Sequence, residues 1–135
     1  MLRVGRRMFV AIIEDHEGLR EAIAALLDSA GYPSRGFASA EAFLRSQQGG
    51  DAACLVLDER LPGGIDGLEL QHQLARAGRR VPIVFISAHE DADPSVTARA
   101  LQDGALAFFR KPFSDADFLT AVSRAWQAGN GGYLG

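Results

Sequence analysis

One short apolar segment, Cys54–Asp58, constrains the fold of this chain more than any other. It is rich in branched side chains and ends abruptly in a carboxylate. The run is too short for a buried helix, and it favours a strand covered on both faces, as in the middle of a parallel sheet. Asp58 would then lie at the carboxyl edge of that sheet, where open α/β sheets bind ligands. Loop-forming residues follow, among them Pro62, Gly63 and Gly64.

The rest of the chain repeats this plan. Apolar runs that end in polar residues alternate with stretches of helical periodicity, and glycine or proline separates many of them. Five βα units in strict alternation predict an α/β fold, with a parallel sheet, helices on both faces and right-handed crossovers. The expected strands are 9–13, 33–37 (an edge strand, given Pro33), 54–58, 81–86 and 105–109. The expected helices are 17–30 before Gly31, one capped by Ser39, one through Leu68, Leu70 and Leu74 before Gly78, one from the Asp93 cap to 103, and one after Ser114.

Length, charge and cysteine content narrow the class of protein. A chain of 135 residues has the length of one domain, which we place at 8–128 between tails at 1–7 and 129–135. The single cysteine, Cys54, rules out a disulfide framework. A formal net charge of −3 argues against nucleic acid as a direct partner. No membrane span or signal peptide is evident, so we expect a cytoplasmic protein.

Chemically active groups follow four of the five predicted strands. Glu14 and Asp15 follow the first strand, Asp58 ends the third, and Ser87 and Lys111 follow the fourth and fifth. Since the ends of parallel strands share one edge, three carboxylates meet in one pocket if the first and third strands are neighbours. Two carboxylates ~4 Å apart repel by about 4 kcal/mol at an effective dielectric constant of 20, so the cluster requires a cation. Oxygen ligands select a hard ion, Mg²⁺ before Zn²⁺.

Such a pocket would also suit a phosphoryl group. Asp58 would attack phosphorus directly, as carboxylates do in aspartyl-phosphate chemistry. Mg²⁺ and the Lys111 ammonium would neutralise the charge on the phosphoryl oxygens. The Ser87 hydroxyl would hydrogen-bond one of those oxygens.

These segments resemble the receiver domains of two-component response regulators. The resemblance covers nearly the whole chain, from about residue 8 to residue 128. Each motif is weak alone, but together they occur in order, each at a predicted strand end. The matching stretches are 13–15, 57–62, 66–67, 86–88 and 108–113, and the last is most similar to FixJ-type regulators.

The resemblance implies a flavodoxin-like, doubly wound fold with strand order 2-1-3-4-5. It implies that Asp58 is the phosphoacceptor and Asp15 a direct Mg²⁺ ligand. Glu14 would act on the ion mainly through water, and the backbone carbonyl of Arg60 would be a further ligand. The peptide bond before Pro112 is expected to be cis, which proline permits at modest cost.

The same resemblance implies a switch. Ser87 would turn toward the phosphoryl group and the Phe108 ring would follow it inward, altering a face formed by the fourth helix, fifth strand and fifth helix. The thin apolar stripe of the fourth helix, Val96, Ala100 and Leu101, suits an element of low local stability. A sensor histidine kinase or a histidine phosphotransfer protein would donate the phosphoryl group. The switching face would bind an output partner or pair two copies as a homodimer.

Three features depart from the usual receiver pattern. The loop at 62–67 is one residue longer and contains Gly63 and Gly64, which leaves its conformation open. Position 108 is Phe, so any hydrogen bond from a Tyr there is absent. No output domain follows Trp126, so the sequence is either a stand-alone receiver or a fragment.

Three other functions fit parts of the pattern. A phosphatase of the haloacid-dehalogenase type needs a second Asp two residues after the nucleophile, where this chain has Arg60. A flavin carrier on the same fold needs hydroxyls and amides after the first strand, where Glu14 and Asp15 would repel the flavin phosphate. A scaffold that is never phosphorylated is disfavoured by the intact Asp58, Asp15 and Lys111.

The three histidines carry weaker expectations. His16 lies beside the acid pair but fits an exposed loop residue better than a metal ligand, and His72 fits a helix surface. His89, two residues after Ser87, either flanks the phosphoryl group with Arg60 or is a solvated loop residue.

Overall fold

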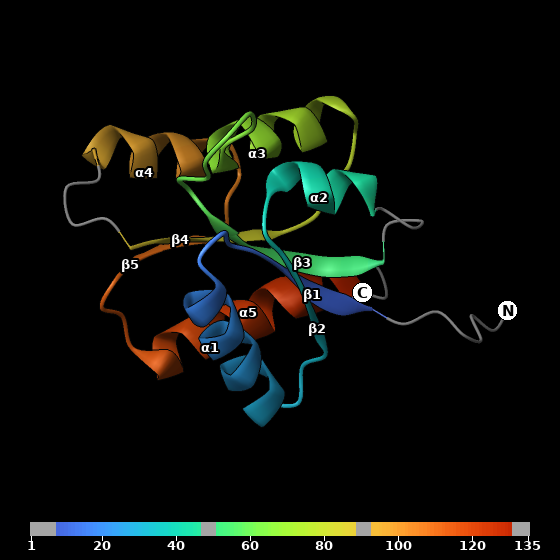
Figure 1. The fold of residues 1–135 in the computed structure, drawn as a ribbon, viewed down its shortest axis with the longest axis vertical. Helices are drawn as coiled ribbons and strands as arrows, with labels where there is room; N and C mark the ends of the chain where they lie inside the picture. Colours follow the sequence, from blue (N-terminus) through green and yellow to red (C-terminus); the bar gives the residue numbers. More distant parts are fainter. Residues whose placement is uncertain (1–7, 47–50, 89–92, 131–135) are drawn as a thin grey trace, which may run out of the picture.

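The computed structural model describes residues 8–46, 51–88 and 93–130, so the expectations for His89 and for the tail at 1–7 concern residues outside these ranges. The strands are β1 (Phe9–Ile13), β2 (Ser34–Phe37), β3 (Ala52–Asp58), β4 (Ile83–Ser87) and β5 (Ala107–Arg110), and the helices are α1 (Glu17–Ser29), α2 (Ala40–Arg45), α3 (Gly67–Arg76), α4 (Pro94–Gln102) and α5 (Asp115–Asn130). The strands form one parallel sheet in the order β2-β1-β3-β4-β5, which confirms the expected topology and the edge position of β2. The layer of α2, α3 and α4 covers one face, and α1 and α5 cover the other (Figure 1).

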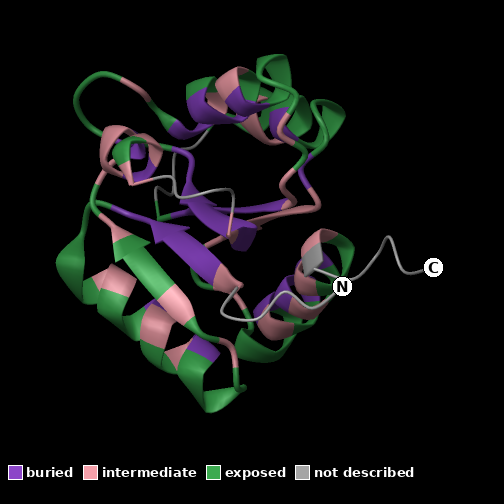
Figure 2. Ribbon diagram, turned by 90° about the vertical axis from the view of Figure 1, so that its right-hand side faces the viewer, coloured by how far each residue is buried: buried purple, intermediate pink, exposed green. Residues whose placement is uncertain are grey.

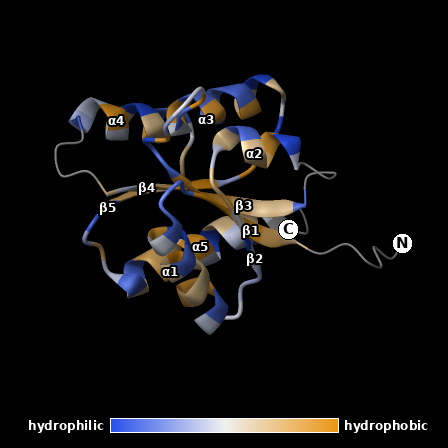
Figure 3. Ribbon diagram, viewed as in Figure 1, coloured by the Kyte–Doolittle hydropathy of each residue, from blue (hydrophilic) through white to orange (hydrophobic). Residues whose placement is uncertain are grey.

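Successive strand residues point to opposite faces of the sheet, so each strand feeds two separate cores. β3 is buried along its whole length, as its apolar run predicted (Figure 2). The central strands are also the most hydrophobic part of the ribbon, whereas the helices carry both kinds of residue (Figure 3). The α1/α5 core includes Val10, Ile12, Cys54, Val56, Val84, Ile86, Phe118 and Val122. The α2–α4 core includes Ala11, Ile13, Leu55, Leu57, Phe85, Leu70, Leu74 and Ala100.

Local sequence signals set the helix ends. The side chains of Ser39, Asp66, Asp93 and Ser114 each accept a backbone N–H from the first turn of the helix that follows. Exposed His16 does the same for α1, since its Nδ1 accepts the Leu19 N–H at 3.1 Å. Gly31 and Gly78, which follow α1 and α3, have φ angles of 89° and 76°, values that favour glycine.

Several element ends differ from the expected ones. β3 starts two residues early, and β4 and β5 each start two residues late. α5 continues to Asn130, so two residues expected in a C-terminal tail are helical. The reason is at Gly129, where an added Cβ would overlap the carbonyl oxygen of Ala53. Glycine therefore lets the last turn of α5 pack directly on the backbone of β3.

α4 is held by less apolar contact than expected. Ala100 is fully buried and Val96 is partly buried, but Leu101 is 46% exposed, so its expected place on the apolar stripe is wrong. Leu101 lies five residues after Val96, or about 140° around the helix, and therefore leaves the stripe. Among the described helices, none is long and apolar enough to cross a membrane.

Candidate functional site

The three predicted carboxylates converge at the carboxyl edge of the sheet. β1 and β3 are neighbours, with Ile13 opposite Leu57, so the acids that follow and end these strands lie side by side. Carboxylate oxygens of Glu14, Asp15 and Asp58 lie within 4.8 Å of one another. The spatial prediction on which the sequence interpretation depended is therefore confirmed.

Burial makes this cluster electrostatically unfavourable. Glu14 and Asp58 are 2% and 4% exposed, whereas Asp15 is exposed. Burial, together with repulsion from neighbouring carboxylates, raises the pKa of Glu14 to about 7 and the pKa of Asp58 to about 6. At neutral pH the bare pair therefore resists carrying its full negative charge.

Backbone hydrogen bonds fix the orientation of both buried acids. Oε2 of Glu14 accepts the His16 N–H at 2.9 Å, and Oδ1 of Asp58 accepts the Arg60 N–H at 3.0 Å. The other oxygen of Glu14, Oε1, is buried and has no hydrogen-bond partner among the residues that the structure describes. A buried carboxylate oxygen in this state is a ligand position that a cation would satisfy.

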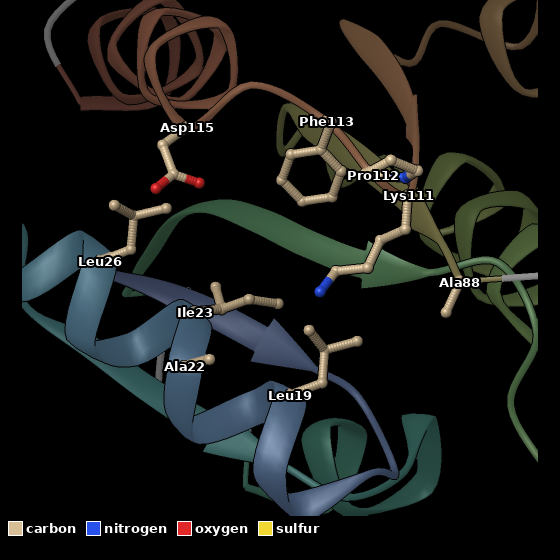
Figure 4. Close-up of a pocket in the computed structure, with 9 residues that line it drawn as sticks. All are labelled: Leu19, Ala22, Ile23, Leu26, Ala88, Lys111, Pro112, Phe113 and Asp115. Carbon is tan, nitrogen blue, oxygen red and sulfur yellow. The ribbon is translucent and has the colours of Figure 1, made fainter.

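Lys111 shares a pocket with these acids. The pocket measures about 750 Å³, and its lining includes Lys111, Arg60 and all three carboxylates. The Lys111 side chain extends from the end of β5 toward α1 (Figure 4), and its ammonium lies 5.9 Å from the centre of the Phe113 ring. It forms no ion pair with any residue that the structure describes. The peptide bond from Lys111 to Pro112 is cis, as expected.

A second pocket, of about 610 Å³, adjoins the first along α1. It lies between Leu19, Ile23 and Leu26 of that helix and the segment 111–115 (Figure 4). The two pockets have Leu19, Ala22, Ala88 and Lys111 in common. The acid pocket is therefore continuous with a largely apolar groove on the α1/α5 side of the molecule.

Strand alternation explains which groups reach the acid pocket. Glu14, Asp58 and Lys111 each come two residues after a strand residue that packs in the α1/α5 core, so they continue the same side of the sheet. Ser87 and the residue after Asp58, Glu59, instead continue the side of the α2–α4 core. The flanking core residues are Ile12, Val56 and Phe109 on the first side and Phe85 and Leu57 on the second.

The position of Ser87 differs from that of the other predicted site residues. Ser87 is fully buried and is absent from the pocket lining. Its hydroxyl donates to Oε1 of Glu59 at 3.3 Å. Glu59, which is 8% exposed, was not predicted as buried because it begins the segment of loop-forming residues that follows Asp58. Its spacing of two residues from buried Leu57 was the available signal.

The loop after β3 is anchored by a contact that its sequence did not predict. The Ile65 N–H donates to Oε2 of Glu41, in the first turn of α2, at 2.9 Å. Gly63 has a φ of 88°, which glycine adopts without strain. At Gly67 a Cβ would overlap the carbonyl oxygen of Asp58, so glycine is needed for this close approach. The longer loop thus returns tightly to the end of β3.

Phe108 lies on the α2–α4 side of the sheet and is partly buried there. Its ring stacks on Phe85 of the neighbouring strand, with centroids 5.6 Å apart and planes at 21°. The Arg110 guanidinium lies 5.9 Å from the centre of the same ring. Phe108 therefore shares a face of β4 and β5 with Ser87, and its role as a switch residue stays a prediction.

Together, this fold and this acid cluster define a receiver domain. The chain belongs to the response regulator receiver domain family, which it matches over residues 10–123. It is therefore a signalling module of the two-component class, and the resemblance noted in the sequence is confirmed.

Among curated relatives, the chain is 39% identical over 116 residues to response regulator protein TmoT of Ectopseudomonas mendocina. It is 40% identical over 119 residues to nodulation protein W of Bradyrhizobium diazoefficiens, and 39% identical over 113 residues to transcriptional regulatory protein FixJ of Azorhizobium caulinodans. These matches cover 86%, 88% and 84% of this chain but 51%, 51% and 52% of the relatives. The chain thus spans about half the length of these relatives.

Solved structures agree with this assignment. The crystal structure of FixJ-N superposes with a TM-score of 0.76 at 31% identity, covering 89% of this chain and 94% of that one. The response regulator StyR superposes with a TM-score of 0.80 at 38% identity, covering 91% of this chain and 61% of that one.

Proposed function

We propose that this receiver accepts a phosphoryl group on Asp58 from the phosphohistidine of a sensor histidine kinase or of a histidine phosphotransfer protein. The observation that carries the proposal is the convergence of Glu14, Asp15 and Asp58 within 4.8 Å, in a pocket that Lys111 also lines. Phosphoryl transfer is catalysed mainly by positioning and by neutralising charge on the phosphoryl oxygens. A nucleophilic carboxylate among metal-ligating acids, with an ammonium beside it, supplies both.

The donor set of the pocket fits Mg²⁺. Its ligand atoms are carboxylate oxygens, which are hard ligands, and Oε1 of Glu14 is buried without a hydrogen-bond partner in the described part of the chain. Asp15 and Asp58 would hold the ion directly, with Glu14 acting through water and the backbone carbonyl of Arg60 as a further ligand. When bound, Mg²⁺ would neutralise charge on the acids and on the phosphoryl oxygens.

In the transfer step, a carboxylate oxygen of Asp58 attacks phosphorus. A new P–O bond forms while the P–N bond of phosphohistidine breaks, and the bond's electron pair leaves with the imidazole, which takes up a proton. The backbone N–H of Arg60 holds Oδ1 of Asp58 and so orients the attacking group. The Lys111 ammonium stabilises the negative charge of the transferred group. Hydrolysis of the acyl phosphate by water then returns Asp58 to its starting state.

The output follows from a change on the face formed by α4, β5 and α5. Ser87 and Phe108 lie on β4 and β5 beneath α4, and only Ala100 of α4 is fully buried. An element with so little buried apolar surface moves at low cost. An output partner, or a second copy of the chain, would bind the altered face.

A turnover phosphatase is the alternative within the same chemistry. An enzyme of the haloacid-dehalogenase type needs a second Asp two residues after the nucleophile, to act as the general acid that protonates the leaving group. Two residues after Asp58 the chain has Arg60, whose side chain is 51% exposed. This observation favours a switch that acts on itself over an enzyme that acts on external substrates.

The test is intact-mass analysis after incubation with acetyl phosphate and Mg²⁺. We expect one added phosphoryl group in the wild type. The modification should not form when EDTA is added before acetyl phosphate, and it should be absent in Asp58→Asn. Glu21→Gln, which removes an exposed carboxylate from α1, is the matched control and should be modified like the wild type. Modification that persists in Asp58→Asn would assign the acceptor elsewhere, and no modification of the wild type would favour the scaffold function.

A further inference from the structure

Glu59 is a buried carboxylate for which the proposed transfer has no role. It follows the phosphoacceptor directly, is 8% exposed, and accepts a hydrogen bond from the hydroxyl of fully buried Ser87 at 3.3 Å. The Nε atom of the Arg60 guanidinium lies 4.0 Å from the same Glu59 oxygen. A buried carboxylate is costly unless hydrogen-bond donors satisfy it, and the Ser87 hydroxyl is one such donor. The question is what a buried carboxylate at this position does.

The two residues lie on the opposite side of the sheet edge from the acid pocket. Asp58 continues the alternation of the α1/α5 core and lines the pocket, whereas Glu59 and Ser87 continue that of the α2–α4 core and do not line it. For the Ser87 hydroxyl to reach a phosphoryl group on Asp58, it must therefore leave Glu59. The hydrogen bond and the proposed switch motion exclude each other.

We propose that Glu59 is a positioning residue that holds the Ser87 hydroxyl away from Asp58 until the phosphoryl group is attached. The inference rests on the proposed function of Asp58 and adds to it a determinant of the switch equilibrium. Every step of the transfer itself proceeds without Glu59. The residue sets how readily the modified state is reached.

The geometry suits a contact that is released rather than permanent. Hydroxyl hydrogen bonds usually measure about 2.5–3.0 Å between heavy atoms, so 3.3 Å marks a weak one. A phosphoryl group carrying two negative charges is the stronger acceptor. On release, Glu59 stays buried without this donor, and the Arg60 guanidinium at 4.0 Å compensates only partly. Glu59 therefore favours the unmodified orientation of Ser87 by a modest factor.

Two substitutions separate this contact from the charge of Glu59. Glu59→Gln removes the charge but keeps an oxygen that accepts the Ser87 hydroxyl, whereas Glu59→Leu removes both. The measurement is the apparent affinity for beryllofluoride, an analogue of a carboxylate-bound phosphoryl group, in saturating Mg²⁺. We expect Glu59→Leu to bind roughly threefold more tightly than Glu59→Gln, in line with one weak hydrogen bond. In a Ser87→Ala background the two variants should bind equally.

Urea unfolding of each variant checks that it is folded, and Glu59→Met replaces Glu59→Leu if the latter is not. Equal affinities of Glu59→Gln and Glu59→Leu in the chain with Ser87 would overturn the inference. So would an affinity ratio that persists in the Ser87→Ala background, because it would not depend on the hydroxyl. Failure of the proposed function is distinct, since the wild type would then not be modified on Asp58 at all.

Discussion

The core beneath α5 and the carboxyl edge of the same sheet are equally buried but contain opposite kinds of group. Beneath α5, Phe118 and Val122 are fully buried, and the Phe118 ring lies 5.4 Å from that of Phe113. At the edge, Glu14 and Asp58 are at most 4% exposed, and one Glu14 oxygen has no hydrogen-bond partner within the described ranges. Burial therefore stabilises the first region and destabilises the second.

The difference assigns separate tasks to the two regions. Removing apolar surface from water contributes about 25 cal/mol per Å², which favours folding. Burying unpaired carboxylates opposes folding, and their raised pKa values express that cost. The rigid α5 side holds in place a cluster that would otherwise separate. The buried acid cluster lowers the stability of the fold, and a bound cation and phosphoryl group would restore it.

The largest expected effect on the free energy of unfolding is that of a substitution in the core beneath α5. Phe118→Ala should lower the free energy of unfolding by about 3–5 kcal/mol, because it removes a fully buried ring and leaves a cavity between α5 and the sheet. Urea denaturation measures this value. Arg124→Ala, on the exposed side of the same helix, should change it by less than about 0.5 kcal/mol. Similar effects of the two substitutions would contradict the conclusion that the core beneath α5 stabilises the fold.

A substitution at the carboxyl edge of the sheet should instead raise the free energy of unfolding. In the absence of Mg²⁺, Asp58→Asn removes one of the mutually repelling carboxylates and keeps an oxygen for the Arg60 N–H. We expect the variant to be more stable than the wild type at pH 8 by on the order of 1–3 kcal/mol. Urea denaturation with EDTA present measures the difference, with Glu21→Gln as the control. A loss of stability at pH 8 would show that the bare site is not under electrostatic strain.

The pH dependence sharpens the same test. The pKa of Glu14 rises from 4.5 to about 7 and that of Asp58 from 3.8 to about 6 on folding. The folded state thus binds more protons than the unfolded state between about pH 4 and 7, so stability decreases as pH rises through this window. Asp58→Asn should show a shallower decrease. Mg²⁺ at pH 8 should stabilise the wild type more than the variant, because the proposed ion would bind the folded state and the variant lacks one of its three carboxylates.

The same two regions differ in how far sequence alone predicted them. Apolar periodicity located both cores, the strand order followed from family resemblance, and Asp15, Asp58 and Lys111 were placed correctly because parallel strand ends share an edge. These features depend on short-range patterns and on one topological rule. The helical state of Gly129 depends instead on its contact with the Ala53 backbone, which no local pattern encodes.

The main features that the sequence did not predict are the hydrogen-bond partners of buried and partly buried polar groups. The Glu59 contact with Ser87 joins residues 28 positions apart, and the Glu41 contact with Ile65 joins residues 24 positions apart. A carboxylate in a glycine- and proline-rich segment has the composition of a solvated loop, so burial can be inferred only once neighbouring strands are placed. Tertiary contacts, rather than propensity, decide these positions.

The smallest expected effect concerns α4, in which Ala100 alone is fully buried. Leu101→Ala should change the free energy of unfolding by less than about 0.5 kcal/mol at low protein concentration, because the side chain is 46% exposed. Urea denaturation at two protein concentrations measures this change, with Leu74→Ala on α3, 3% exposed, as the buried control that should cost about 2–5 kcal/mol. A cost at Leu101 that grows with protein concentration would indicate that a second copy covers this face, since oligomerisation makes stability depend on concentration. Contact with the second copy would then stabilise α4, and the difference in packing between α4 and α5 would hold only for the monomer.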